Sequence, residues 1–283
     1  MTRTHPHTGH DHKHGTGSQE EILDLDAEVL AEHLTAIIEW LPLATSPSHI
    51  VDLGCGTGAG TFALLDRFPE ARVTAVDASP GHLQRLQEKA CARDMDDRVH
   101  IVQADLDDAG WPDLGTPDLV WASASMHHMT DPDRVIRNIH DLLAPGGLFT
   151  VVELAGFPRF LPADAPEDRP GLEERCHAAT DHFHAEHLPH RGADWGPMLT
   201  AAGFAIDGKR TITVHIEGSR DEAIGRYALS ALQRIRGAAA QALSPEDLAA
   251  LDRLLDTGGP HSILRRGDLA VRTERTVWAA RRT

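Results

Sequence analysis

The sequence of 283 residues lacks the features that define several large protein classes. It has no run of about 18 apolar residues, so we expect no membrane-spanning helix. The N-terminus has no apolar signal-peptide core, which favours a cytoplasmic protein. The three cysteines, Cys55, Cys91 and Cys176, form neither a disulfide framework nor a CxxC zinc motif. Lysine is scarce while arginine is abundant, a bias typical of a GC-rich bacterial genome.

The composition is that of an acidic globular protein. The formal net charge is −16, and no long acidic run concentrates it. Such a surface repels phosphate backbones, so we expect no nucleic-acid partner. Hydrophobic residues make up 41% of the chain and charged residues 25%, which excludes a disordered or fibrous protein and allows a large buried core.

The distribution of apolar residues divides the chain into a tail and one domain. Residues 1–18 contain five histidines and almost nothing apolar, so we expect a disordered tail. We assign no metal site, although the histidines of the tail and of the cap leave incidental metal binding open. The single domain at 19–283 is predicted to comprise an N-terminal lid helix (19–47), a cofactor-binding core (48–155), a cap insertion (156–200) and the last strands (201–283), with a two-helix insertion at 218–258.

Short apolar segments alternate with helical patterns through the predicted core. The predicted strands are 49–53, 72–77, 99–105, 118–123 and 148–154, and the predicted helices are 61–68, 80–92 and 132–143. This alternation predicts an α/β fold with a mostly parallel sheet and helices on both faces. The carboxyl ends of the strands then share one rim, where ligands bind. Segments 204–216 and 269–279 are the candidates for the last two strands.

A glycine-rich turn follows the first predicted strand. Gly54, Gly56 and Gly58 allow a sharp turn and the close approach of a ligand to the backbone. The next helix directs free N–H groups toward that ligand. Asp77 follows after about twenty residues, where an acid accepts the hydroxyls of a ribose. The turn alone also fits the G-x-G-x-x-A pattern of dinucleotide-binding proteins, which leaves a nicotinamide-dependent oxidoreductase open.

Taken together, the motifs of residues 48–155 resemble the class I S-adenosylmethionine-dependent methyltransferases. The matching segments are Val51–Gly58, Val76-Asp77, Ala104–Leu106, Ser125–Met129 with Asp131-Pro132, and Leu143–Gly147, in the order of that family. The His-His pair and the Pro-Gly-Gly turn are most similar to the branch with the ubiquinone-biosynthesis and trans-aconitate methyltransferases. The resemblance implies a Rossmann-like sheet of seven strands, the last one antiparallel, with an added helical cap.

The resemblance also implies S-adenosylmethionine as the cofactor and assigns residues to it. The matching cofactor positions are Asp52, Gly54, Cys55, Gly56, Asp77, Ala78, Ala104, Asp105, Leu106 and Ser123. In the family, the glycine loop faces the methionine part of the cofactor, and Asp52 is expected to support that loop. The resemblance gives Asp77 the ribose hydroxyls and Asp105 the adenine amine. Ser123 is expected near the amino group of the cofactor.

Methyl transfer needs little acid–base chemistry, because the sulfonium is already activated. The protein must align the acceptor with the methyl group and exclude water, and a base helps where the acceptor loses a proton. His127 follows the fourth predicted strand at the open rim. It is therefore the candidate catalytic base, or else a histidine that fixes the rim loop. His128, Glu153 and Trp195 are the candidate substrate contacts.

We therefore predict an S-adenosylmethionine-dependent methyltransferase that acts on a small molecule by direct in-line transfer. The oxidoreductase alternative is weak, because the only tyrosine, Tyr227, is followed four residues later by Ala231, which excludes a Tyr-x-x-x-Lys pair. A non-catalytic S-adenosylmethionine-binding protein is a further alternative. The sequence leaves open the acceptor molecule, the acceptor atom (O, N or C) and the oligomeric state.

Overall fold

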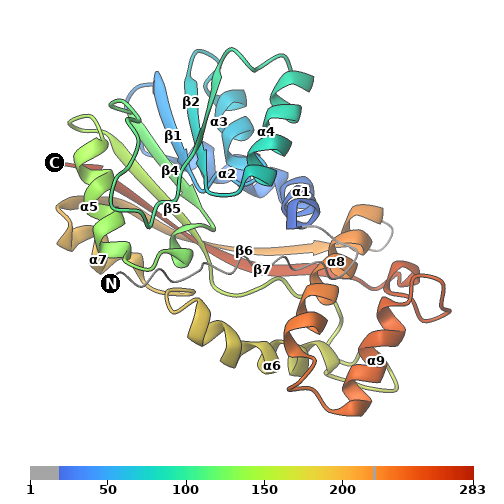
Figure 1. Ribbon diagram of the computed structural model, residues 1–283. Helices are drawn as coiled ribbons and strands as arrows, with labels where there is room; N and C mark the ends of the chain where they lie inside the picture. Colours follow the sequence, from blue (N-terminus) through green and yellow to red (C-terminus); the bar gives the residue numbers. More distant parts are fainter. Residues whose placement is uncertain (1–18, 219–220) are drawn as a thin grey trace, which may run out of the picture.

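The structure, a computed structural model, describes residues 19–218 and 221–283, except for the side chains of 182–187. The histidine-rich segment 1–18, predicted to be disordered, lies outside the described residues. Seven strands form one sheet (Figure 1). They are β1 (His49–Leu53), β2 (Arg72–Asp77), β3 (Val99–Gln103), β4 (Leu119–Ser123), β5 (Leu148–Leu154), β6 (Phe204–Glu217) and β7 (Ala270–Arg282). No helix in the described part of the chain is long and apolar enough to cross a membrane.

The sheet has the strand order β3-β2-β1-β4-β5-β7-β6. Strands β1 to β5 pair in parallel, whereas β7 lies antiparallel between β5 and β6. This arrangement confirms the predicted Rossmann-like, mostly parallel sheet of seven strands. The register brings the carboxyl ends of four strands to one rim: Leu53 pairs with Val76 and Ala122, and Asp77 pairs with Gln103.

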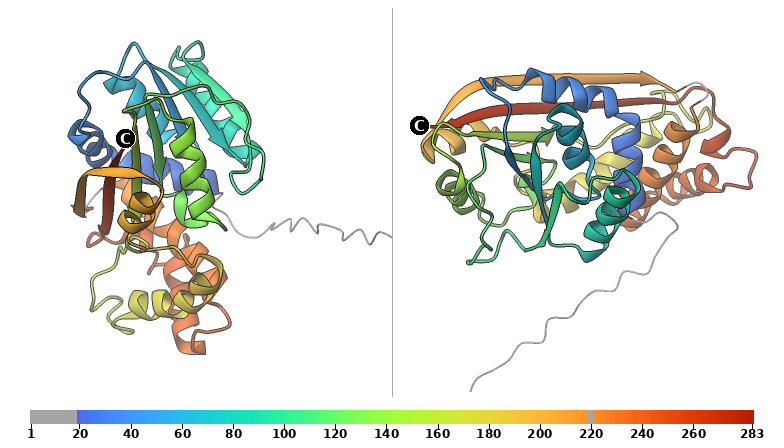
Figure 2. Two further views of the ribbon diagram at one scale, coloured as in Figure 1. Left: turned by 90° about the vertical axis from the view of Figure 1, so that its left-hand side faces the viewer. Right: turned by 90° about the horizontal axis from the view of Figure 1, so that it is seen from above.

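Helices cover both faces of the sheet, because its strands bury apolar side chains on both sides. These helices are α2 (Ala31–Trp40), α3 (Ala59–Arg67), α4 (Pro80–Ala92), α5 (Pro132–Leu142) and α7 (Trp195–Ala201). In β1, Ile50 packs with residues of α2 and α3, whereas the next residue, Val51, packs with residues of α5 and α7. Burial on both faces is typical of parallel sheets. The turned views in Figure 2 show the sheet between its helices.

Two of these helices begin at their predicted first residues, and each is capped by a side chain. The Ser79 side chain accepts a hydrogen bond from the backbone of α4, and the Asp131 side chain accepts one from the backbone of α5. Each helix has a proline in its first turn, where a backbone N–H would have no acceptor within the helix, so its absence costs no hydrogen bond. The segments that follow β2 and β4 are thereby held at the rim.

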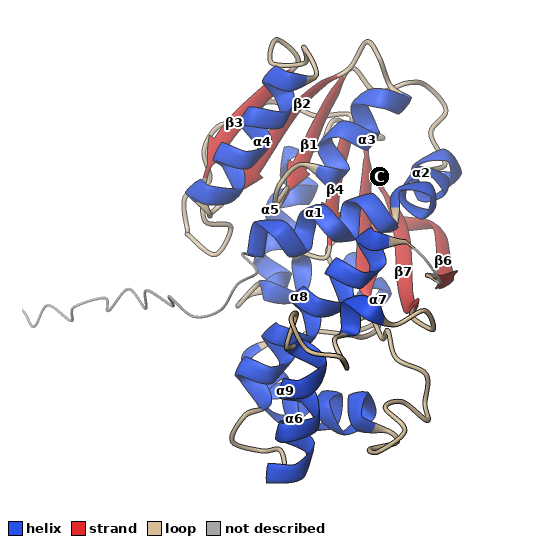
Figure 3. Cartoon of the chain, turned by 90° about the vertical axis from the view of Figure 1, so that its right-hand side faces the viewer, coloured by secondary structure: helices blue, strands red, loops and turns tan. Residues whose placement is uncertain are grey.

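The remaining long helices form a helical cap beyond the rim (Figures 1 and 3). They are α6 (Leu172–His187), α8 (Glu222–Ala239) and α9 (Pro245–Leu255). The three helices contribute to one buried apolar cluster, and the buried carboxylate of Asp247 in α9 pairs with Arg169 and Arg175. The cap is thus built from two chain segments, one before β6 and one between β6 and β7.

The N-terminal segment forms two helices rather than the single helix that the sequence predicts. α1 (Gln19–Val29) and α2 are separated at Leu30, where the backbone has φ −100° and ψ 13°. α1 packs on α8 of the cap, whereas α2 packs on α3, so the chain bends between two surfaces. Leu30 is buried and continues the apolar spacing, and for that reason the sequence pattern does not reveal the break.

One part of the predicted cap insertion, residues 195–200, belongs to a sheet-covering layer instead. Here α7 places Trp195 and Leu199, both fully buried, in the cluster that holds Phe204 and Trp278 of the sheet. The apolar side of this short helix covers the end of the sheet next to β6 and β7. The cap proper therefore ends before α7.

Candidate functional site

The loop after β1 requires glycine at several positions. Gly54, Gly56 and Gly58 have φ angles of 67°, 53° and 94°, a region that other residues rarely adopt. A Cβ atom on Gly54 would lie 2.4 Å from Cβ of Ser125, and one on Gly56 would lie 3.2 Å from Cδ1 of Leu23. The loop therefore passes closely between Ser125 and α1.

Asp77, at the end of β2, holds this loop in place. Its Oδ2 accepts a hydrogen bond from Gly56 N at 2.9 Å, and its Oδ1 accepts one from Ser79 N at 2.8 Å. His82 Nδ1 lies 3.2 Å from the same Oδ1. Burial alone would raise the pKa of Asp77, but the hydrogen bonds from His82, Ser79 and Gly56 together lower it. The carboxylate is therefore ionised at neutral pH, and its Oδ2 can accept from a further donor.

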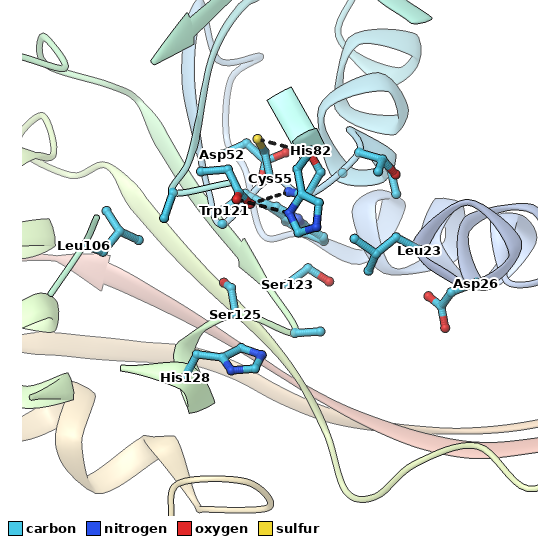
Figure 4. A pocket seen from close by; sticks show the side chains of 18 of the residues that line it. Leu23, Asp26, Asp52, Cys55, His82, Leu106, Trp121, Ser123, Ser125 and His128 are labelled. Carbon is cyan, nitrogen blue, oxygen red and sulfur yellow. Dashed lines mark hydrogen bonds and ion pairs between the residues drawn. The ribbon is translucent and has the colours of Figure 1, made fainter. Parts of the chain in front are cut away.

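Asp52 and Trp121 provide two polar groups deep in the same site (Figure 4). Asp52 Oδ2 accepts a hydrogen bond from Thr61 Oγ1 at 2.7 Å, and burial raises the pKa of Asp52 to about 7. Trp121 Nε1, on the neighbouring strand β4, is buried without a hydrogen-bond partner. Both groups lie within 3.1 Å of the point where a Cβ on Gly60 would stand. A buried acid beside a free N–H donor suits a ligand that carries both a cationic and an anionic group.

All the positions that the resemblance assigns to the cofactor line one cavity of about 400 Å³. They are Asp52, Gly54, Cys55, Gly56, Asp77, Ala78, Ala104, Asp105, Leu106 and Ser123. They come from the ends of β1 to β4 and from the loops that follow. Asp105 is exposed at the edge of the cavity, where its side chain accepts from Asp107 N at 2.9 Å, and Leu106 is buried beside it. The structure thus brings these residues together around one space.

Helix α1 closes one side of this cavity, and its Leu23 projects toward the space (Figure 4). Asp24 fastens the helix to the glycine loop, because its Oδ1 accepts from Thr57 Oγ1 at 2.7 Å. The same carboxylate pairs with Arg85 and Lys89 of α4. The predicted lid segment therefore lies at the cavity, although its spacing pattern did not single out the anchoring carboxylate.

A second cavity of about 390 Å³ adjoins the first. The residues that line both are Gln19, Leu23, Asp26, Ala124, His128 and Arg275. The walls that belong to the second cavity alone are mostly apolar and come from α1, from α8 and from the segment around the end of β5. The site therefore joins a polar space at the sheet rim to an apolar space under the cap.

His127 and Glu153 form a buried pair at the second cavity. His127 Nδ1 lies 2.6 Å from Glu153 Oε2, and the His127 backbone N–H donates to Glu153 Oε1 at 3.2 Å. Their side chains are 5% and 2% exposed, and only the histidine lines the cavity. With Nδ1–H held by the carboxylate, Nε2 is the ring's acceptor. Glu153, predicted to contact the substrate, lies behind His127 instead.

His128 lines both cavities, and its ring centroid lies 4.2 Å from that of His127. Its side chain is open to the cavity space, as Figure 4 shows. Desolvation in this recess, together with the adjacent His127, lowers the pKa of His128 to about 4. The ring is therefore neutral at pH 7 and can exchange hydrogen bonds with a ligand, as expected of a substrate contact.

A polar network that sequence analysis missed joins the lid, the sheet and the cap. Asp26 of α1 accepts hydrogen bonds from Arg275 Nη2 of β7, at 2.7 Å to each carboxylate oxygen, and from the Tyr227 hydroxyl of α8 at 2.5 Å. Arg275 is only 9% exposed and lines both cavities. No local pattern could have revealed this network, because Asp26 is 201 residues from Tyr227 and 249 residues from Arg275 in sequence.

Two further features concern the predicted substrate contact of Trp195 and the groups that could bind a metal. The predicted substrate contact of Trp195 is wrong, because this side chain is fully buried in α7 and lines neither cavity. Among the described residues, no group of three or more His, Cys, Asp or Glu side chains is placed to hold a metal ion. Three histidines of the cap, His182, His184 and His187, lie outside the described side chains.

Comparison with known sequences places these residues among methyltransferases. Residues 51–149 match the family described as a methyltransferase domain. The chain is 31% identical over 202 residues to 27-O-demethylrifamycin SV methyltransferase of Amycolatopsis mediterranei (strain S699), which covers 66% of this chain and 73% of that protein. It is 41% identical over 113 residues to trans-aconitate 2-methyltransferase of Paracidovorax citrulli (strain AAC00-1), over 39% of this chain. The match spans only 40% of that relative's length.

Solved structures share the fold at low sequence identity. The YcgJ protein from Bacillus subtilis has a TM-score of 0.52 at 18% identity and covers 89% of this chain and 99% of that one. The cyclase SpnF has a TM-score of 0.53 at 21% identity and covers 89% of this chain and 81% of that one. Since one of these proteins is described as a cyclase, the fold by itself does not specify the reaction.

Proposed function

Because the chain belongs to the class I S-adenosylmethionine-dependent methyltransferase family, we propose that it transfers a methyl group from S-adenosylmethionine to a small-molecule acceptor. The observation that carries this proposal is the pair of adjoining cavities. One is lined by residues that match the family's cofactor positions, and the other is apolar and reached by His127. Relatives that act on trans-aconitate and on a demethylrifamycin support small acceptors, and we expect the reaction in the cytoplasm of a bacterial cell.

The residues of the first cavity fit S-adenosylmethionine. The free N–H of Trp121 suits the carboxylate of the methionine part, and the buried Asp52 suits its ammonium group. Asp77 keeps acceptor capacity on Oδ2 for a ribose hydroxyl, and Asp105 stands at the exposed edge for the adenine amine. When bound, S-adenosylmethionine supplies a methyl group on a sulfonium, whose sulfur keeps the electron pair of the bond that breaks.

We assign the proton transfer to His127. Its Nε2 takes the proton of an acceptor hydroxyl while the oxygen attacks, and the proton stays on the imidazolium until it passes to water. Glu153 positions the ring through Nδ1 and stabilises the imidazolium charge, because it is buried and lies 2.6 Å away. His128 is a hydrogen-bonding contact beside the acceptor. An acceptor that is already a carboxylate needs no base, and His127 would then only orient it.

The lid and the cap exclude water from the transfer. α1 contributes side chains to both cavities, and α8 contributes to the walls of the second. Asp26 links the two helices, since it binds Tyr227 of α8 and Arg275 of β7. Closure of this kind keeps the aligned cofactor and acceptor bound for longer, and it strengthens the electrostatic interactions in the site.

Calorimetric titration of the full chain with S-adenosylhomocysteine and with NAD⁺ tests the cofactor. We expect saturable binding of S-adenosylhomocysteine and no binding of NAD⁺. Tight NAD⁺ binding without a response to S-adenosylhomocysteine would contradict the proposal in favour of an oxidoreductase. Transfer of labelled methyl groups to a panel of small acceptors, trans-aconitate included, then tests catalysis. Cofactor binding without transfer to any acceptor that itself binds the second cavity would indicate a non-catalytic binding protein.

A further inference from the structure

We propose that the acceptor is a mainly apolar molecule with one hydroxyl group and one anionic group, and that Arg234 of α8 binds the anion. The inference rests on the proposed function and names the acceptor class of the second cavity. It follows from three features of that cavity: its apolar walls, the pairing of its other charges, and the position of Arg234.

The walls of the second cavity favour an apolar body. One side of α8 lines it with Tyr227, Ala231, Ile235 and Ala238, spaced so that they share a face of the helix. Apolar residues of α1 and of the segment that includes Phe157 complete the enclosure. A cavity of about 390 Å³ accommodates a molecule of one or two fused rings, and its walls leave few polar groups for hydrogen bonds.

The other charges of this cavity already have partners. The Arg275 guanidinium is bound by Asp26 through both carboxylate oxygens, so this pair is neutral as a whole. Glu153 is engaged by His127. His128 is neutral at pH 7, because desolvation and the nearby His127 lower its pKa to about 4. These groups orient and move protons, but they leave no surplus positive charge for an anion.

Arg234 is the exception among the charged groups that line the cavity. Its side chain is exposed and lines the second cavity, and it forms no ion pair or hydrogen bond with a described residue. Other arginines of α8 are paired: Arg226 lies 3.5 Å from Glu28, and Arg236 lies 2.7 Å from Asp252 of α9. The charge of Arg234 also contributes to the lowered pKa of His128, after desolvation and His127. Because Arg234, His127 and His128 line the same cavity, one ligand can reach the guanidinium and direct its hydroxyl toward the histidines.

The same charges disfavour an acceptor with several carboxylates. A tricarboxylate would face the carboxylate of Asp26, with a single unpaired guanidinium, that of Arg234, to offset its charge. Like charges in a recess of low dielectric repel strongly, and each carboxylate without a donor loses its hydration. One anionic group, by contrast, matches one free guanidinium. A hydroxyl group at the other end uses the acceptor Nε2 of His127, which a polyacid would not need.

Three probes distinguish these acceptor classes by calorimetry on the full chain with S-adenosylhomocysteine present. They are 6-hydroxy-2-naphthoate, 2-naphthol, which lacks the carboxylate, and trans-aconitate. We expect 6-hydroxy-2-naphthoate to bind most tightly, 2-naphthol more weakly and trans-aconitate not at all. Arg234→Gln should weaken the binding of 6-hydroxy-2-naphthoate about fivefold, which is the upper range for the loss of an exposed ion pair. The same variant should leave the affinity for 2-naphthol unchanged.

The matched control is Arg236→Gln, which removes a charge from the same helix on the side that faces α9. It should leave the affinity of both naphthols within twofold of wild type. Tighter binding of trans-aconitate than of 6-hydroxy-2-naphthoate, equal losses for both naphthols in Arg234→Gln, or no naphthol binding at all would overturn the inference. Binding of S-adenosylhomocysteine is measured first, because its absence would contradict the proposed function and not the acceptor class.

Discussion

The cofactor core and the helical cap use their polar side chains in different ways. In the core, Asp77 binds the backbone N–H groups of Gly56 and Ser79, so a side chain shapes a loop. In the cap, Asp247 binds the side chains of Arg169 and Arg175. The core therefore builds its site from backbone geometry that a short motif encodes. The cap builds its wall from pairings between distant side chains, which can change without loss of the cofactor site.

The largest effect is expected on the rate of methyl transfer, from variants of His127 and Glu153, which lie between the core and the cap. His127→Gln and Glu153→Gln should each reduce the rate of methyl transfer to a hydroxyl acceptor by about 10²–10⁴-fold, because the first removes the proposed base and the second disturbs its tautomer. Initial rates at saturating cofactor measure the effect. His140→Gln, a partly exposed histidine of α5, is the control and should keep the wild-type rate. Rates within twofold of wild type for both boundary variants would leave alignment as the whole mechanism.

The glycine loop after β1 is expected to be distorted by the addition of one methyl group at Gly54. Gly54→Ala places a Cβ 2.4 Å from Ser125 Cβ at a φ of 67°, so strain and overlap add. Gly146→Ala is the matched control, since Gly146 has a φ of 75° but open space around the new Cβ. We expect Gly146→Ala to lower the free energy of unfolding by about 1–2 kcal/mol. Gly54→Ala should lower the free energy of unfolding by about 1–3 kcal/mol more than Gly146→Ala does.

Urea unfolding monitored by circular dichroism gives both free energies. Gly54→Ala should also weaken the binding of S-adenosylhomocysteine, whereas Gly146→Ala should not. Equal losses of stability in the two variants would mean that the close approach of the loop to Ser125 does not contribute to the free energy of unfolding.

The contact between lid and cap is expected to have a smaller effect. Tyr227→Phe removes the hydrogen bond to Asp26, which is 2.5 Å long and made to a charged group. The loss should lower the free energy of unfolding by about 1.5–3 kcal/mol. Hydrogen exchange should be accelerated more in α1 than in β1 and β2, since α1 makes this contact directly. Unchanged exchange in α1 would show that Asp24 and the Asp26–Arg275 pair hold the lid without this hydrogen bond.

The smallest predicted effect concerns the pH dependence of the core. The hydrogen bond to Asp77 raises the pKa of His82, so the folded state binds a proton more tightly than the unfolded state. The stabilisation is fully present below the ordinary histidine pKa of about 6.5 and is lost as the pH rises through the folded value. His82→Gln should therefore lower the melting temperature more at about pH 5.5 than at about pH 8.5. A difference from wild type that is the same at both pH values would contradict this pairing.

The same comparison explains how much the sequence could predict. The glycine loop and the acid of Asp77 act through backbone geometry, so their pattern predicted a ligand site at the rim. The alternation of strands and helices predicted the fold. Helices α4 and α5 likewise begin at their predicted residues, where Ser79 and Asp131 make capping contacts only a few residues away. Such features can be read from a single sequence, because the interacting groups are at most 21 residues apart in the chain.

The features that were missed depend on long-range packing. Asp26 and Arg275 meet through tertiary structure alone, and nothing in the residues around either one indicates the partner. Trp195 was expected at the substrate, but an aromatic residue that starts a short amphipathic helix is buried as readily by the sheet as by a ligand. The break at Leu30 is hidden for the same reason, since its apolar character suits a straight or a bent helix.

Titration of Asp77→Ala and His127→Gln with S-adenosylhomocysteine, side by side with wild type, tests the division between the cofactor cavity and the acceptor cavity most directly. Asp77 binds the glycine loop in the cofactor cavity, whereas His127 lines only the acceptor cavity. Asp77→Ala should therefore weaken binding by about 1.5–3 kcal/mol, the value for hydrogen bonds to a charged group. His127→Gln should leave the affinity within twofold of wild type. Equal losses in both variants, or no loss in Asp77→Ala, would contradict the account.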